Sequence, residues 1–151
     1  VADLSKFGLS EPAIYLNKLE FKDTIRPQKD TILLSKDGSV GIAYKVEEPI
    51  DVITSGAIIH LNITDKDVLP DYLTLVLNSF VVKLQAERDA GGSIIQHWKP
   101  SEIEDVIIPI LPPSEQVTIS KMLQQSFTLR KESKRLLQEA IQIVETAIEE
   151  N

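Results

Sequence analysis

The sequence contains no cysteine, which excludes a disulfide framework, a zinc ribbon and a thiol nucleophile. Nothing therefore argues for an oxidising compartment, and we expect a cytoplasmic protein. No apolar run approaches the roughly 18 residues that a membrane-spanning helix needs, and the first residues show no secretory signal. Aromatic residues make up only 5% of the chain, but 42% is hydrophobic and 26% is charged, which is typical of a globular protein. With 151 residues, the chain has room for one domain and one appendage.

The sequence also lacks the residue spacing of metal and nucleotide sites. Its two histidines, His60 and His97, are far apart, so we expect no metal ligation. Asp65, Asp67 and Asp71 lack the central glycine and closing glutamate of a calcium loop, and they fit better as acids before or in the first turn of a helix. No phosphate-binding glycine loop and no hydrolase nucleophile motif occurs. We therefore predict no catalytic residue, no metal and no cofactor.

The formal net charge of −7 speaks against a nucleic-acid binder, because phosphate contacts need lysine and arginine. The charge is unevenly distributed, however. Residues 1–46 hold seven basic and six acidic side chains, whereas residues 47–71 hold six acidic side chains and only Lys66. A neutral or mildly basic face beside an acidic one is therefore compatible with this sequence.

Short strands separated by turn residues are predicted for the first hundred or so positions. Residues 31–35 and 40–46 are expected to form a hairpin around the turn 36–39, in which Gly38 supplies a positive φ. Residues 50–54 and 57–63 are expected to form a second pair around Ser55-Gly56. Two further strands are predicted, one at Ser93–Trp98 and one, at a sheet edge because of Pro109, at Asp105–Leu111.

Helical periodicity appears twice. A helix is predicted from Pro70 until Gly91-Gly92 ends it, with one buried face formed by Leu73, Val76, Leu77, Phe80, Val81 and Leu84. Lys99-Pro100-Ser101 is expected to be a cap-like turn. From Glu115 to about Glu149 there is no glycine or proline, so one helix of about 52 Å is predicted, with Ser114 as its N-cap. The fold class is therefore α+β, a β-rich domain followed by a long helix.

This long helix has a heptad pattern. Small residues (Ser126, Ser133, Ala140, Ala147) and large ones (Met122, Leu129, Leu136, Ile143) each recur every seven positions and form the a and d positions of a pairing seam. Small a residues permit close approach of a second helix. Further apolar residues outside the seam indicate contact with more than one neighbour. The alternative is that the helix folds back along its own domain.

Polar and basic residues gather in the predicted turns. Side chains of these types can contact base edges and phosphates. The candidate DNA-binding residues are Arg26, Lys29, Lys36, Ser39, Gln96 and Lys99. The alternative for each of them is an ordinary solvated loop.

The segment Gly91–Gln124 resembles the junction between a target recognition domain and a conserved helix in specificity subunits of type I restriction-modification systems. The resemblance rests on a Gly-Ser pair, an apolar strand, a Pro-Pro step, a Glu-Gln pair and a helix opening with isoleucine. In this chain these are Gly92-Ser93, Ile107–Leu111, Pro112-Pro113, Glu115-Gln116 and Ile119. Upstream, the Ser35–Gly41 hairpin and the Tyr72–Ser79 helix are similar to those of the same family.

The resemblance implies a target recognition domain at residues 1–111, which could lack its N-terminal part, and a spacer and dimerisation helix at residues 112–151. It implies double-stranded DNA, modification (methyltransferase) subunits, in some systems a restriction subunit, and a second copy or second half paired through antiparallel helices as partners. Catalysis and S-adenosylmethionine would belong to the modification subunits. Specificity subunits usually contain two recognition domains and two conserved helices, so we expect either an excerpt or a half-sized subunit that dimerises.

Two other functions stay open at this stage. The net acidity favours a protein–protein interaction module that assembles a complex through its long helix without nucleic acid. The chain could also be the C-terminal recognition domain of a single-chain methyltransferase, although no Asn-Pro-Pro-aromatic signature occurs in these residues.

Overall fold

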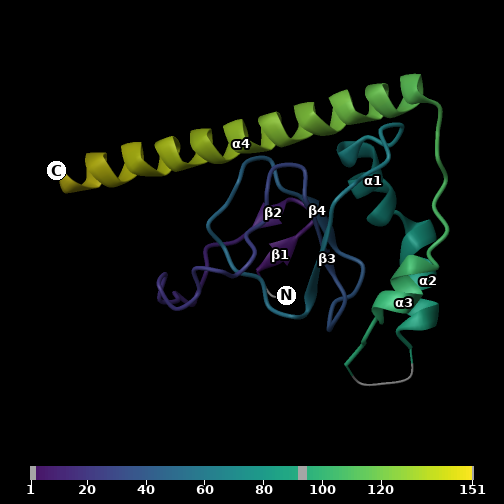
Figure 1. Ribbon diagram of the computed structural model, residues 1–151. Helices are drawn as coiled ribbons and strands as arrows, with labels where there is room; N and C mark the ends of the chain where they lie inside the picture. The colour runs from purple at the N-terminus through teal and green to yellow at the C-terminus, as the bar shows by residue number, and fades with distance from the viewer. Residues whose placement is uncertain (1–2, 92–94, 151) are drawn as a thin grey trace.

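A three-stranded antiparallel sheet lies in the middle of the computed structural model, which describes residues 3–91 and 95–150 (Figure 1). The strand order is β4-β3-β5, with β3 at Ile32–Ser35, β4 at Ala43–Lys45 and β5 at Ile58–Leu61. Strand β3 is the central strand, and all four of its residues are buried. This is expected for a strand that is covered on both faces. The predicted α+β class and the predicted first hairpin are confirmed.

Alternate side chains of β3 enter two different hydrophobic clusters. Ile32 and Leu34 pack with helix residues and with Trp98 in the larger cluster. Leu33 points to the other face and packs with Leu4 and Val46. Leu4 comes from a small hairpin of β1 (Leu4–Ser5) and β2 (Gly8–Leu9), which covers that face.

The predicted second strand pair is wrong. Strand β5 pairs with β3, in the register Leu33 opposite His60, and residues 50–54 form no strand. The free edge of the buried β3 offers a continuous row of backbone partners, and β5 takes that edge. Residues 50–54 are tied instead by single contacts, such as the bond between the Thr54 hydroxyl and the His60 ring at 2.9 Å.

The single helix predicted after Pro70 is two helices, α1 (Pro70–Leu77) and α2 (Phe80–Asp89). The break falls at Asn78, whose side-chain amide bonds both backbone groups of Ala43 in β4, at 3.2 Å and 2.7 Å. Because of the break, α2 does not continue the helical register of α1. It turns a different face to the core, and Val82 and Ala86 are its buried residues.

The predicted buried face is accordingly correct for Val76 and Leu77 but wrong after the break, where Phe80 is 74% and Leu84 is 60% exposed. Val81 is also exposed. Helix α2 ends at Asp89, just before Gly91, and Gly92 lies outside the described residues.

The predicted strand 93–98 is wrong as far as it is described. Residues 93 and 94 lie outside the described part, and of the remaining residues only His97 forms an isolated bridge, to Asp37. The expected turn at Lys99-Pro100-Ser101 is the start of helix α3 (Pro100–Glu104). The Glu102 carboxylate explains this helix, because it accepts a hydrogen bond from the Lys99 backbone N–H at 2.9 Å and so caps the first turn.

The segment 105–111 forms no strand, so its predicted edge position is wrong. Side chains take the place of a neighbouring strand. Gln85 bonds both backbone groups of Ile107, at 3.0 Å and 2.9 Å, and the Tyr72 hydroxyl donates to the Pro109 carbonyl at 2.6 Å. These bonds satisfy the extended backbone and connect it to α1 and α2.

Helix α4 covers Pro113–Glu149, 37 residues or about 55 Å. The predicted uninterrupted helix is confirmed, but Pro112 rather than Ser114 occupies the N-cap position. Pro113 already has the φ angle that a first helical turn requires, so the helix starts two residues earlier than predicted. In Figure 1, α4 runs past α1 and over the strands, and its C-terminal part extends beyond the body of the molecule. Among the described residues, no helix is long and apolar enough to cross a membrane.

Candidate nucleic-acid interface

The turn between β3 and β4 is held from the inside. Ser35 is fully buried, and its hydroxyl donates to the Ser39 carbonyl and accepts from the Ile42 N–H at 2.9 Å. Gly38 and Gly41 have φ angles of 75° and 80°, a region that favours glycine. The backbone of this turn is therefore fixed, while the Ser39 side chain stands on its exposed outer surface.

A distant segment returns to this turn and extends it. The Gly38 N–H donates to the Gln96 carbonyl at 2.9 Å, and the Trp98 N–H donates to the Lys36 carbonyl at 2.7 Å. Trp98 is only 1% exposed and fixes the segment in the larger hydrophobic cluster. Four of the six candidate DNA-binding residues are thereby brought to one region. They are Lys36, Ser39, Gln96 and Lys99.

A carboxylate lies at the centre of this region. Asp37 is 2.8 Å from the Lys36 ammonium and 2.9 Å from His97 Nδ1. The hydrogen bond from Lys36, and then that from His97, lower the pKa of Asp37, so this group is ionised throughout the neutral range. Lys99 pairs with Glu102 at 2.9 Å, and this hydrogen bond raises the pKa of Lys99. Both lysines are held by carboxylates that a phosphate group could replace.

The sequence did not indicate Asp37 and His97 as a pair, because they are 60 positions apart. The polar segment from Gln96 to Lys99 was the available signal, but its partner is defined only by the fold. His60, by contrast, lies in β5 away from this region, where its ring bonds the Thr54 hydroxyl at 2.9 Å and burial lowers its pKa. Within residues 3–91 and 95–150, no group of three or more histidine, aspartate or glutamate side chains could hold a metal ion.

The other two candidates lie before β3, at the opposite end of the strand from the turn. The Arg26 guanidinium donates to Asp51 at 3.1 Å, to the Phe21 carbonyl at 2.9 Å and to the Thr24 carbonyl. Arg26 therefore fixes the loop that precedes it, together with Lys18, which also pairs with Asp51 at 2.9 Å. Lys29 is exposed. The structure does not bring Arg26 and Lys29 to the region around Asp37.

Helix α4 has two distinct faces. One face follows a 4-3 spacing through Gln116, Ser120, Leu123 and Phe127, all buried or half-buried, and so covers the body of the molecule. Arg130 continues this face and lies over the Phe7 ring of the β1–β2 hairpin, 4.1 Å from its centroid. From residue 131 to residue 150 every residue is exposed.

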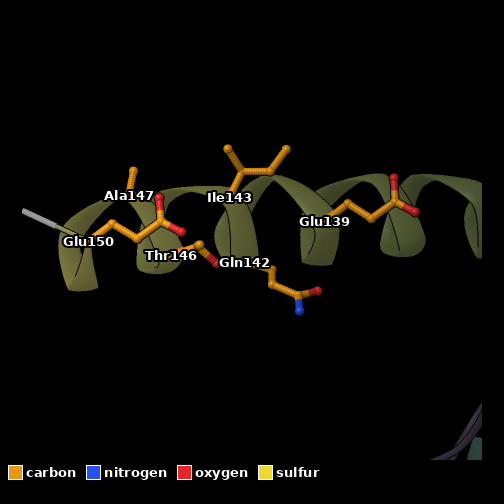
Figure 2. A pocket seen from close by; sticks show the side chains of 6 residues that line it. All are labelled: Glu139, Gln142, Ile143, Thr146, Ala147 and Glu150. Atoms are coloured by element: carbon orange, nitrogen blue, oxygen red, sulfur yellow. The ribbon is translucent and has the colours of Figure 1, made fainter.

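Each residue of the predicted pairing seam comes one position before a residue of this face, as Met122 does before Leu123, so the seam is rotated by about 100° around the helix axis. Its large members are exposed by 52% to 70%, namely Met122, Leu129, Leu136 and Ile143. Figure 2 shows Ile143 and Ala147 on the same side of the last turns of α4 and Gln142 on the other side. The helix therefore lies along its own domain with one face only, and the seam is a separate surface.

These observations define a class of protein, namely a small α+β domain that presents a rigid polar turn and carries a long helix. The C-terminal part of this helix extends beyond the domain. Comparison with known families gives the same result more specifically. The family described as type I restriction modification DNA specificity domain matches residues 4–142. The chain therefore belongs to this family, and its role is DNA recognition in type I restriction-modification. No curated protein was found to match the chain.

Proposed function

We propose that this chain reads one half of a split DNA target and that the modification subunits of its complex supply catalysis. The observation that supports this best is the convergence of Lys36, Ser39, Gln96 and Lys99 on one rigid surface. Lysine reaches phosphates, and serine and glutamine hydrogen-bond bases or sugars, so the surface combines both kinds of DNA contact. Arg26 and Lys29 would serve a second contact, separate from this surface, at the other end of β3.

The net charge of −7 limits what the isolated chain can bind. Two lysines engaged with carboxylates give little phosphate affinity, because each contact must first displace Asp37 or Glu102. In the proposed complex, partner subunits contribute most phosphate contacts and this chain contributes sequence choice. Weak DNA binding by the chain alone is therefore expected.

In this proposal, residues 1–111 form the recognition domain and residues 112–151 form the spacer. The seam of Met122, Ser126, Leu129, Ser133, Leu136, Ala140, Ile143 and Ala147 pairs with the antiparallel helix of a second copy or second half. The two recognition domains are then held at a fixed separation, and this separation determines the number of bases between the half-sites. The face that covers the domain in the first half of α4 becomes apolar and exposed beyond it, at Leu137, Ile141 and Ile148, and we assign this part to a modification subunit.

Replacing Lys36 by alanine tests the DNA contact. The affinity of the assembled complex for its methylated target duplex should fall about tenfold, and the slope of log affinity against log salt should decrease by about one. Lys66→Ala is the matched control, because Lys66 is an exposed lysine in the acidic segment. Equal affinity of both variants would refute the assignment of Lys36.

Deleting the reading frame and sequencing modified bases in the source genome tests the function as a whole. Loss of methylation at one split motif is expected, and a palindromic motif would indicate two identical recognition domains. If methylation is unchanged while the partner subunits are expressed, the alternative that the net acidity favours applies, namely an interaction module that assembles a complex without contacting DNA.

A further inference from the structure

A buried glutamine joins the start of α4 to the rest of the molecule. The Gln116 side chain is 0% exposed, although its amide is polar. Its Oε1 accepts from the Leu69 N–H at 2.9 Å, and its Nε2 donates to the carbonyls of Asp67 at 2.9 Å and Leu111 at 2.8 Å. One side chain thus connects α4, the linker before it and the loop that enters α1.

A second glutamine repeats this connection eight residues further along the same face. Gln124 Nε2 donates to Asp71 Oδ2 at 2.7 Å. The other oxygen of Asp71 is 2.8 Å from the ammonium of Lys45 in β4, and both of these side chains are about nine-tenths buried. Gln116 and Gln124 are about 12 Å apart along the helix axis. One point of attachment to the loop that enters the short helix α1 and one to α1 itself fix both the position and the direction of α4.

Apolar packing alone would not fix them. The 4-3 pattern of this face repeats every seven residues, so a shift by one repeat exchanges one apolar contact for another. The buried Gln116 amide does not allow such a shift. Its three hydrogen-bond partners are in place in one position of the helix only, and any shift would leave a buried polar group without partners. Single polar residues define register in coiled coils in the same way.

The direction of α4 matters because the helix is long. A tilt of about 10° at its start moves the far end of a helix of about 55 Å by roughly 10 Å, which is about three base-pair steps. We propose that Gln116, supported by Gln124 and Asp71, is a positioning residue that determines the spacing between the two half-sites and has no part in choosing their bases. This inference rests on the proposed function of α4 as the spacer.

The helix direction can be measured without DNA. The chain has no cysteine, so cysteines introduced at Glu87 on α2 and Gln138 on α4 accept spin labels selectively. Pulsed-EPR distances are then recorded with an excess of unlabelled chain, so that only pairs within one chain contribute. We expect one narrow distribution for the labelled parent and for the control Gln125→Leu, an exposed position on α4. Gln116→Leu should broaden or shift the distribution by several ångströms while the helix content stays the same.

Gln124→Leu is the second variant, for the case that Gln116→Leu does not fold. The Gln124 side chain lies at the surface, so its replacement should leave the fold intact. It should broaden the distribution to a smaller extent. Distributions identical to that of Gln125→Leu for every folded variant would overturn the inference.

The effect on spacing is measured with the assembled methyltransferase complex and a duplex library in which two fixed half-sites are separated by a varied number of bases. The parent should methylate one spacing, and Gln116→Leu should accept neighbouring spacings as well with unchanged half-site bases. A variant that merely destabilises the chain would lose methylation at the native spacing without gaining others, and that result would refute the positioning role. If the parent complex methylates no half-site, the proposed function fails instead, while the distance measurement still decides the helix direction.

Discussion

The two halves of α4 have the same heptad spacing and very different surroundings. In the first half, the face toward the domain includes the polar residues Gln116, Ser120 and Gln124, and two of these make hydrogen bonds to α1 or its entry loop. In the second half, the same face consists mainly of exposed apolar residues such as Leu137 and Ile148. Polar residues thus define the contact that the chain makes with itself, while unspecific apolar surface is left for a partner. The seven-residue repeat is common to both halves of α4. It therefore predicts which side of the helix is apolar, but it does not predict whether the domain or a partner covers that side.

The largest expected effect follows from removing the charge that supports the first half. Asp71→Ala leaves the buried Lys45 ammonium with Glu47 at 3.2 Å and Asp30 at 3.7 Å as its remaining partners. Removing one side of a buried ion pair is strongly destabilising, and we expect a loss of about 3 kcal/mol in the free energy of unfolding. Urea unfolding at a fixed protein concentration measures it. Glu139→Ala, in the exposed second half, should change this free energy by less than about 0.5 kcal/mol.

A matched pair of enlarged side chains should sharpen the contrast. Ser120 is 6% exposed against the domain, so Ser120→Leu overfills this contact and should cost about 1–3 kcal/mol of unfolding free energy. Ala140→Leu adds similar volume in the exposed seam and should leave the unfolding of the recognition domain unchanged. If helix pairing occurs as proposed, Ala140→Leu should instead reduce the dimer fraction in light scattering. Equal effects of both substitutions on domain unfolding would remove the distinction between the two halves.

A smaller effect is expected where the two halves meet. The Arg130 guanidinium lies over the Phe7 ring, which is itself 46% exposed. Phe7→Leu keeps the apolar contact but removes the cation–π interaction, which is worth about 0.5–1 kcal/mol at an exposed site. Amide hydrogen exchange of α4 should then become faster near residue 130 and stay the same near residue 120. Uniformly unchanged exchange would show that Arg130 contributes nothing to holding the helix.

The smallest effect concerns pH and lies within the domain, away from both halves of α4. Burial lowers the pKa of His60 because it disfavours the charged ring. The unfolded chain therefore binds this proton at a higher pH than the folded chain does, so stability is complete above about pH 6.5 and declines as the pH falls below that value. NMR titration should place the His60 midpoint below 6.5, and His60→Gln should reduce the loss of stability between pH 7 and pH 5. A normal midpoint would contradict this account.

The long helix and the first hairpin were predictable because their signals are local. A run without glycine or proline defines α4, and Lys36-Asp37-Gly38-Ser39 defines a turn whatever surrounds it. The second strand pair was predicted wrongly because residues 50–54 and the free edge of β3 compete for β5, and local sequence does not decide between them. The break between α1 and α2 was missed because its cause, the bond between Asn78 and Ala43, spans 35 positions.

The candidate site divides in the same way. Residue type identified Lys36, Ser39, Gln96 and Lys99 individually, but their grouping depends on backbone bonds between residues about 60 positions apart. Arg26 has the same chemistry as a DNA-binding residue, and only its three acceptors revealed that it fixes a loop. Gln116 was visible in sequence as part of a family pattern, with nothing to indicate that it is buried.

The sequence by itself therefore determined the α+β class, the helix and its repeat, because helix formation and turn formation depend on neighbouring residues. Only the tertiary structure decided which strand joins β3, where the polar side chains converge and which face of α4 covers its own domain. These features depend on contacts between distant segments that compete for the same edges and surfaces, and the outcome of that competition depends on the packing of the whole chain.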